Sequence, residues 1–348
     1  MRALQLVEIG RMVVAELPDP EPGPGEVVVQ IIATGICGSD IHGFTGDNGR
    51  RVAGQVMGHE TVGRIHAIGE GVDPAAAPIG AIATINPLIL TPERMGIFAG
   101  REQHDPERQV IGVNPELVSA FAQYVVVPDR NIVLLPDTMP VLYGALIEPL
   151  AVALNAVRRV AVAPGESVLV VGGGPIGQSV ILAARYVGAG GVYVSEPDPA
   201  RRALCEKLGA IALDPREAPI AAQIVMRHGS AVDVAIDAVG VSETLADALQ
   251  STSYGGRVCL VGMGRQELSL AAFRVSTEER SIVGAFCYSF AGFRDAADWV
   301  GTGDPLFGLL VSAEVAIDEA PGAFERLAGH PDVPGKLLVR LTTAPPVE

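Results

Sequence analysis

The chain has 348 residues, enough for two domains, and 49% of its residues are hydrophobic although only 5% are aromatic. Its formal net charge of −15 argues against nucleic acid or an anionic membrane surface as a partner. The N-terminus lacks the apolar core of a signal peptide, and no uninterrupted apolar run reaches membrane-spanning length. We therefore expect a cytoplasmic protein without a disulfide framework, since its four cysteines are far apart: Cys37, Cys205, Cys259 and Cys287.

The first part of the chain has the pattern of a β-rich domain. Residues 1–17 predict one or two short strands, which a Pro/Gly-rich turn segment follows. Between 26 and 127, short β runs punctuated by glycines predict a compact, strongly curved β domain. These runs cover 27–32, 61–65, 81–85 and 122–127. Residues 92–109 form a polar insertion that predicts a surface lobe, and 140–160 predict a helix leading into a second domain.

Strands and helices alternate from about residue 164 to 290, which is the pattern of a doubly wound parallel sheet and predicts an α/β fold. The expected strands are 168–171, 192–195, 232–237, 258–262 and 281–286. A final strand over 335–341 is expected to return to the first domain. The predicted boundaries are a first domain at 1–155 and 294–348 and a second domain at 156–293, inserted between its two parts.

A glycine-rich turn follows the apolar run 168–171. Gly172, Gly174 and Gly177 have G-x-G-x-x-G spacing and permit a tight turn, a close approach to pyrophosphate and close packing of helix on strand. Glu196 ends the next apolar strand, where an acid can bind the ribose 2′-hydroxyl and repel a 2′-phosphate, which favours NAD over NADP. Arg201 is placed to stack on adenine, although an arginine there is also how a 2′-phosphate is accommodated. A tight turn that binds nothing is the structural alternative.

Three stretches contain side chains that bind metals. Cys37 lies in a Gly-rich segment, His59 and Glu60 follow Gly58, and Glu148 precedes a proline. Thiolate, imidazole and carboxylate suit a Zn²⁺ site with one position open to water or substrate. Taken singly, each has a structural alternative: a small buried cysteine, a hydrogen-bonded core histidine or solvated acids. The residues alone leave both interpretations open.

Together these motifs resemble the zinc-dependent branch of the medium-chain dehydrogenase/reductase family, close to the polyol, butanediol and threonine dehydrogenases. The resemblance covers essentially the whole length. It implies a GroES-like β-rich catalytic domain with an inserted Rossmann domain, and hydride transfer between NAD and a secondary alcohol or polyol. The motifs that carry it are Gly35–His42, Gly58–Glu60, Ile147–Leu150, Val171–Gly177 and Asp237–Gly240.

The resemblance also assigns roles to individual residues. It implies that Cys37, His59 and Glu60 bind a catalytic zinc, which would lower the pKa of the substrate hydroxyl. Glu148 is then a fourth ligand or lies beside the metal-bound water. Two further residues match a proton relay, Ser39 and His42; Ser39 has the alternative or additional role of a helix N-cap.

The dinucleotide positions implied by the resemblance lie along the glycine turn and the ends of the later strands. They are Gly172, Gly174, Pro175, Ile176, Gly177, Glu196, Arg201, Val239, Val261, Gly262, Met263, Phe286 and Cys287. We expect the substrate pocket to be lined by Phe44, by the segment after Asn86, and by side chains near Phe290 and Trp299.

One feature departs from most relatives, which carry four closely spaced cysteines for a structural zinc. Here no cysteine occurs between Cys37 and Cys205, and the lobe offers only His104 and acids. We therefore expect one zinc per chain, a lobe held by packing or by a neighbouring subunit, and a homodimer or homotetramer. Two alternatives stay open: a zinc-free quinone or enone reductase of the same fold, and a non-catalytic dinucleotide-binding protein.

Overall fold

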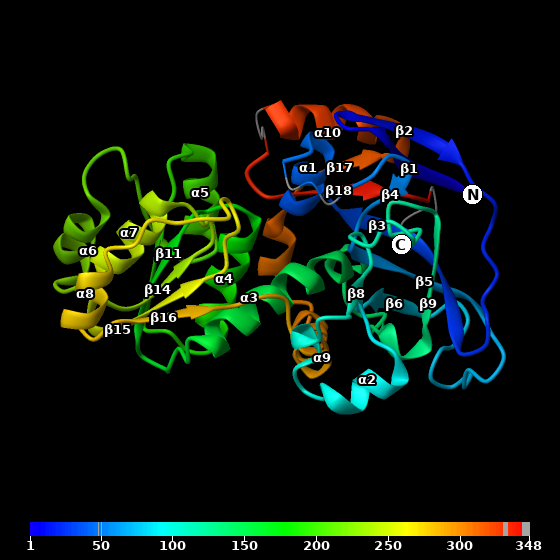
Figure 1. The fold of residues 1–348 in the computed structure, drawn as a ribbon, viewed down its shortest axis with the longest axis horizontal. Coiled ribbons are helices and arrows are strands. Elements are labelled where there is room, and N and C mark those ends of the chain that lie inside the picture. Colours follow the sequence, from blue (N-terminus) through cyan, green and yellow to red (C-terminus); the bar gives the residue numbers. More distant parts are fainter. Residues whose placement is uncertain (48, 50, 330–332, 343–348) are drawn as a thin grey trace. The chain divides into compact units, whose positions relative to one another are not determined.

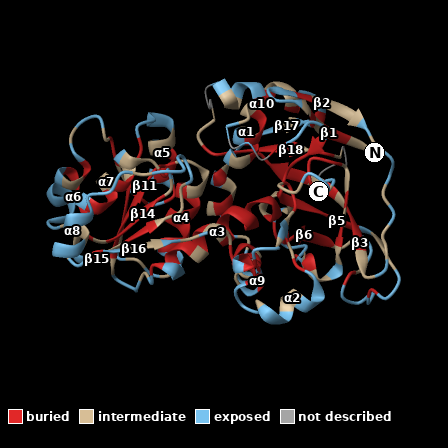
Figure 2. Cartoon of the chain, viewed as in Figure 1, coloured by how far each residue is buried: buried red, intermediate tan, exposed pale blue. Residues whose placement is uncertain are grey.

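The computed structural model describes residues 1–47, 49, 51–329 and 333–342, and its chain divides into two compact units (Figure 1). Unit 1 comprises Met1–Glu148 and Ser289–Glu348, and unit 2 comprises Pro149–Tyr288. Buried residues fill the interior of each unit separately (Figure 2). Each unit therefore has a core of its own.

A seven-stranded sheet forms the centre of unit 1, and β3 (Glu26–Gly35) is its central strand. β3 is long and apolar, and it pairs antiparallel with three neighbours, β5, β9 and β18. The pairing with the C-terminal strand β18 is the return that the sequence predicts for this segment. The other strands of the sheet are β5 (Glu60–Ile68), β6 (Ile82–Ile85), β9 (Tyr124–Pro128), β10 (Ile132–Leu134), β17 (Val311–Ala316) and β18 (Lys336–Arg340).

Smaller elements complete the core of unit 1. A three-stranded sheet has the order β2 (Arg11–Glu16), β1 (Arg2–Glu8), β4 (Gln55–Val56), and the helices α1 (Gly38–Thr45) and α10 (Ala320–Gly329) contact each other. Phe44 of α1 packs against Phe324 of α10 with the rings tilted and their centroids 5.7 Å apart, and Phe121 meets the same ring edge-on at 5.6 Å. Phe44, expected to line a substrate pocket, is thus buried in this aromatic core.

The polar insertion forms a lobe of unit 1 that an ion pair closes. It contains β7 (Leu88–Ile89), α2 (Pro92–Ile97), the 3₁₀ turn η1 (Glu102–His104) and β8 (Gln109–Val110), which pairs with β7. Asp105 is fully buried, and the Arg94 guanidinium Nε lies 2.7 and 2.6 Å from its two oxygens. The backbone N–H of Glu107 also donates to Asp105, at 2.9 Å. A charged hydrogen-bond network therefore holds the lobe together.

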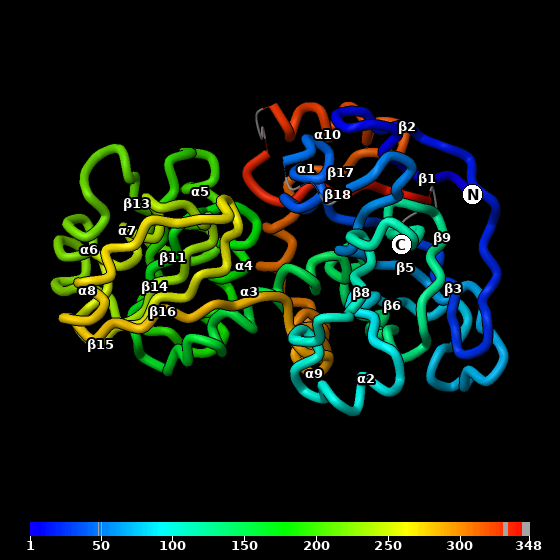
Figure 3. The backbone as a smooth tube through the Cα atoms, viewed as in Figure 1, coloured from blue at the N-terminus to red at the C-terminus, as the bar shows by residue number. Residues whose placement is uncertain are grey.

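Unit 2 contains one parallel sheet of six strands in the order β13, β12, β11, β14, β15, β16, which is the doubly wound topology predicted from the sequence (Figure 3). Five of the strands overlap the predicted ranges, although β15 begins at Thr252, six residues before the predicted start, and β16 ends at Gly284, two residues before the predicted end. β13 was missed because three residues are too short to show an alternating pattern. The strands are β11 (Ser167–Val171), β12 (Gly191–Ser195), β13 (Ile211–Leu213), β14 (Val232–Asp237), β15 (Thr252–Leu260) and β16 (Ser281–Gly284).

The remaining elements are mainly helices. The predicted 140–160 helix is a 3₁₀ segment, η3 (Val141–Leu146), followed by α3 (Ile147–Arg159). Together they are long and apolar enough to cross a membrane, but 67% of the most apolar window is buried inside the protein, which is typical of a core helix. The others are α4 (Pro175–Tyr186), α5 (Pro199–Lys207), α6 (Ile220–His228), α7 (Ser242–Ser251), α8 (Ala272–Thr277), α9 (Phe290–Val300) and the 3₁₀ turns η2 (Asp129–Asn131), η4 (Pro305–Leu310) and η5 (Ile317–Glu319).

The lobe provides a first test. The Arg94 hydrogen bond lowers the pKa of Asp105, so the ionised carboxylate stabilises the fold above the pKa of an unfolded aspartate, and this stabilisation is lost as the pH falls through the lowered value. Asp105→Asn should therefore speed proteolytic cleavage within residues 92–109 at neutral pH. Glu107→Gln removes a partly solvated partner of the same arginine and is the control. Equal cleavage in the two variants would contradict the role of Asp105.

Candidate functional site

Three predicted metal ligands converge in unit 1. Cys37 follows β3 and precedes α1, while His59 and Glu60 stand at the start of β5. One ligand atom from each lies within 4.8 Å of the other two, and no other such group of three or more occurs in the described part of the chain. Gly58, with φ of +96°, makes the turn that places His59 at the head of the strand. The sheet pairing of β3 with β5 therefore assembles the cluster.

The cluster fits a zinc ion. His59 is 92% buried and Glu60 fully buried, yet His59 Nδ1 and Glu60 Oε2 have no hydrogen-bond partner within the protein. Burying unpaired polar atoms is unfavourable, and a bound cation would relieve part of that cost. A thiol, an imidazole and a carboxylate are the donor types that Zn²⁺ takes. Glu148, in the first turn of α3, is also buried and adds negative potential at His59, although it lies outside the tight group of three.

Asp40 is a member of the site that the sequence analysis missed. It is fully buried, one oxygen lies 3.7 Å from His59 Nδ1, and the other accepts the Cys37 N–H at 3.0 Å. Burial raises the pKa of Asp40, opposed by His59, the Cys37 N–H and Arg51. At 3.7 Å the Asp40 oxygen and His59 Nδ1 are not hydrogen-bonded, so this carboxylate acts on the ring through its charge and leaves Nδ1 open to a metal. Asp40 could have been found from the sequence, because it lies three residues after Cys37 in the same motif.

The electrostatics around His59 favour its charged form while no metal is bound. Burial lowers the pKa of His59, but the Asp40 carboxylate, Cys37 and Glu148 raise it by more than burial lowers it. The net pKa of His59 therefore lies well above its ordinary value. A metal must therefore displace a proton from this ring.

Ser39 and His42 lie on α1 beside Cys37. Three residues apart, they share one side of the helix; Ser39 is half-buried and His42 is exposed. The N-cap of α1 is Cys37, so the suggested N-cap role for Ser39 is wrong.

Lys336 is the second residue that sequence reasoning missed. It opens β18 and is buried, and its Nζ lies 2.7 Å from Glu60 Oε1. Nothing in the sequence marks this contact, because the two residues are 276 positions apart and meet only through the sheet.

In unit 2 the strand register aligns the predicted dinucleotide residues. Val171 pairs with Ser195 and Asp237, Asp237 with Leu260, and Leu260 with Gly284, so five strands end at one edge of the sheet. In doubly wound proteins, ligands bind outside this edge. Within three residues of these ends lie most of the predicted positions: Gly172, Gly174, Glu196, Val239, Val261, Gly262, Met263, Phe286 and Cys287.

The glycine turn has the geometry of a phosphate-binding loop. Gly172 has φ of +96°, and a Cβ on Gly177 would overlap the Gly172 carbonyl oxygen. At Gly174, by contrast, an added Cβ would meet nothing closer than the Arg201 guanidinium at 4.0 Å. Pro175 and Ile176 then begin α4, which presents unpaired backbone N–H groups at its first turn. The turn is thus open where a pyrophosphate would approach.

Glu196 is more buried than its predicted role requires, at 4% exposure. Its two oxygens accept backbone N–H groups, from Gly173 at 2.7 Å and from Asp198 at 2.8 Å. The carboxylate therefore braces the glycine turn, and each oxygen keeps a lone pair for a further donor. Beyond the last strand, Cys287 has φ of +47°, a conformation uncommon outside glycine and often found at ligand sites.

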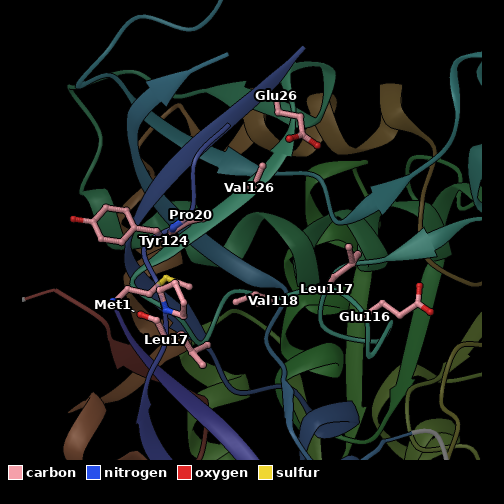
Figure 4. A pocket seen from close by; sticks show the side chains of 10 residues that line it. Met1, Leu17, Pro20, Glu26, Glu116, Leu117, Val118, Tyr124 and Val126 are labelled. Carbon is pink, nitrogen blue, oxygen red and sulfur yellow. Dashed lines mark hydrogen bonds between the residues drawn. The ribbon is translucent and has the colours of Figure 1, made fainter. Parts of the chain in front are cut away.

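A surface pocket of about 370 Å³ lies elsewhere on unit 1 (Figure 4). Figure 4 shows its lining of apolar side chains with Tyr124 and two acids, and it shares no residue with the Cys37 cluster. It is lined by Met1, Leu17, Pro18, Pro20, Glu26, Glu116, Leu117, Val118, Tyr124 and Val126.

Known families match both units. Residues 23–137 match the Alcohol dehydrogenase GroES-like domain, and residues 175–302 match Zinc-binding dehydrogenase. The chain belongs to the zinc-dependent medium-chain dehydrogenases. This confirms the resemblance and the predicted fold class, and makes the protein an oxidoreductase.

Relatives of this medium-chain dehydrogenase cover most of its length. An L-threonine 3-dehydrogenase from Pyrococcus abyssi is 34% identical over 73% of each chain. The crystal structure of 2R,3R-butanediol dehydrogenase from Bacillus subtilis superposes with a TM-score of 0.88, at 29% identity, over 97% of this chain and 99% of that one. A zinc-binding dehydrogenase from Sinorhizobium meliloti, solved bound to NADP, gives a TM-score of 0.90 at 31% identity, over 97% and 98% of the two chains.

Proton release on metal binding gives a second test. Because the pKa of His59 is raised in the metal-free protein, zinc competes with a proton for this ring. The apparent zinc affinity should therefore fall by about tenfold for each unit by which the pH is lowered and for each proton displaced. Calorimetric titration in buffers of different ionisation enthalpy measures the protons released. Asp40→Asn removes the charge that favours imidazolium and should reduce the release. A zinc affinity independent of pH would contradict the assignment of His59 as a ligand.

Proposed function

We propose that this dehydrogenase uses one zinc ion and NAD to oxidise a secondary alcohol or polyol, or to reduce the corresponding ketone. Unit 1 would serve as the catalytic domain and unit 2 as the dinucleotide domain. The observation that carries the proposal is the buried group of Cys37, His59 and Glu60, with atoms that lack partners inside the protein. The open glycine turn at the carboxyl edge of the parallel sheet supports the cofactor assignment.

In this proposal Cys37, His59 and Glu60 hold the zinc, and Glu148 acts as a fourth ligand or beside it. When bound, zinc supplies a Lewis acid for the substrate oxygen, and NAD supplies the hydride acceptor. Asp40 places a negative charge 3.7 Å from His59 Nδ1. Ser39 is half-buried and His42 exposed, so the pair offers a route by which the hydroxyl proton reaches water.

Both named relatives support the substrate class. Threonine and butanediol each carry a secondary hydroxyl group next to a second polar substituent, and the relatives that act on them cover most of this chain. A zinc-free quinone or enone reductase would have no use for the buried thiol, imidazole and carboxylate.

The proposal of one zinc per chain is supported by the lobe. Where most relatives carry cysteines, the half-buried Arg94 pairs with the buried Asp105, and this ion pair would close the lobe. A cytoplasmic homodimer or homotetramer remains our expectation for the assembly.

Preference for NAD is proposed from Glu196. Its carboxylate is fixed by two backbone N–H groups at the edge of the sheet, where it would repel a 2′-phosphate. Two nearby arginines are already engaged by Asp214: Arg202 at 3.0 Å and Arg216 at 2.8 Å. Arg201 is then left as the cation beside the turn. The charge balance favours a ribose with a free 2′-hydroxyl.

Cys37→Ser tests the metal and the reaction together. Loss of the thiolate should remove most of the bound zinc and abolish turnover, while NAD affinity stays largely intact because the glycine turn belongs to unit 2. The measurements are zinc content, NAD binding and activity with NAD across polyols, vicinal diols, 3-hydroxy amino acids and simple secondary alcohols. Cys259→Ser, at a buried strand position far along the chain, is the control for losing a thiol. Turnover that survives without zinc would instead indicate the zinc-free reductase, and NAD binding without any turnover a non-catalytic protein.

Glu196→Gln tests the cofactor preference. Removing the charge while keeping the size of the side chain should lower the ratio of kcat/KM for NAD to that for NADP by about tenfold or more. Glu206→Gln, on the exposed side of α5, is the control. An unchanged ratio would place the discrimination elsewhere.

A further inference from the structure

A buried lysine stands against the candidate metal ligands. Lys336 is 3% exposed, and its Nζ lies 2.7 Å from Glu60 Oε1 and 3.5 Å from the carbonyl oxygen of Ile36. Strand pairing produces this contact, because Gly35 of β3 lies opposite Glu60 on one side and Leu338 of β18 on the other. The contact therefore belongs to the central sheet of unit 1.

Glu60 and Lys336 lie so close to Gly35 that a larger residue at that position would not fit. A Cβ on Gly35 would overlap the Glu60 carboxylate and would come within 3.2 Å of Lys336 Cδ. Glu60 is thus held with one oxygen on the ammonium, while Oε2 has no hydrogen-bond partner in the protein. A carboxylate in this position can be shared between two cations.

A lysine at this position is unusual for this chain. Of its 25 basic residues, Lys207 and Lys336 are lysines and the others are arginines. Lys207 is exposed at the end of α5, so Lys336 is the one placed in a buried site. Its ammonium places a compact point charge against Glu60 Oε1.

A count of formal charges shows what Lys336 contributes to the site. Cys37 as thiolate, Glu60 and Glu148 would bring three negative charges, and a zinc ion two positive ones. Asp40 adds one more negative charge, which the buried Arg51 opposes. The ammonium of Lys336, 2.7 Å from Glu60 Oε1, therefore supplies the remaining positive charge.

We propose that Lys336 is the counter-charge of the metal centre, which competes with the metal for Glu60 and so keeps Glu60 an exchangeable ligand. This inference rests on the proposed function, because it requires that Cys37, His59 and Glu60 hold zinc. Lys336 is a positioning residue, since it acts through Glu60. Without the ammonium, the metal is the sole strong partner of the buried carboxylate, and the site carries one excess negative charge.

The decisive measurement is zinc affinity by competition with a chromophoric chelator. Lys336→Gln keeps a hydrogen-bond donor for Glu60 but removes the charge, and it should bind zinc about tenfold more tightly, or more, with lower kcat. Lys336→Arg keeps the charge and should stay within a few-fold of the parent protein. Lys207→Gln is the matched control and should change neither quantity. In the cobalt-substituted Lys336→Gln variant, the visible absorption should shift as Glu60 moves to the metal.

A second measurement needs no variant. With two lysines in the chain, a protein carrying nitrogen-15 only in lysine gives two side-chain signals, and zinc should move that of Lys336 and leave that of Lys207 in place.

Equal or weaker zinc binding by folded Lys336→Gln, or a Lys336 signal that zinc does not move, would overturn the counter-charge and leave the proposed function standing. A parent protein that binds no zinc would overturn both.

Discussion

The pairing of β3 with its neighbours is the constraint on which the candidate site depends. Cys37 follows this strand, Glu60 begins the strand on one side, and Lys336 begins the strand on the other. A shift of one residue in either register would turn Glu60 or Lys336 to the opposite face of the sheet. The long apolar run of β3 fixes the register, because its Val and Ile side chains fill the core of unit 1. Packing far from the site thus determines its geometry.

In unit 2, strand register also determines which residues lie close together. Parallel strands in register end together, so the residues just beyond β11, β12, β14, β15 and β16 gather at one edge whatever their separation along the chain. The exposed apolar side chains Val239, Met263 and Phe286 lie at this edge, where a solvent-facing surface would favour polar ones. An apolar surface of this kind is better suited to contact the flat face of a ring than to contact water.

The parts predicted from the sequence are those with a local signal. The glycine turn, the strands of unit 2 and the motifs around Cys37 and His59 all have short-range patterns, and the structure places them as expected. Contacts between distant segments had no such signal. Lys336 meets Glu60 through β18, and Arg94 meets Asp105 across the lobe, so neither pair could be found from spacing. Phe44 was misplaced for a related reason: an aromatic side chain near a site motif is equally suited to a core, and its partner Phe324 lies far along the chain.

The distribution of buried cations explains why the site can hold so many acids. Among the described residues, the buried arginines and lysines are Arg51, Arg280 and Lys336, and two of these three face the acids of the candidate metal site. Arg51 opposes Asp40 and Lys336 opposes Glu60, so the acids behind and beside His59 each have a basic partner. Because an unpaired buried charge is far more costly than a paired one, these cations reduce the cost of burying the acids. The protein's own basic side chains therefore compensate part of the negative charge of the site, and a divalent ion would compensate the rest.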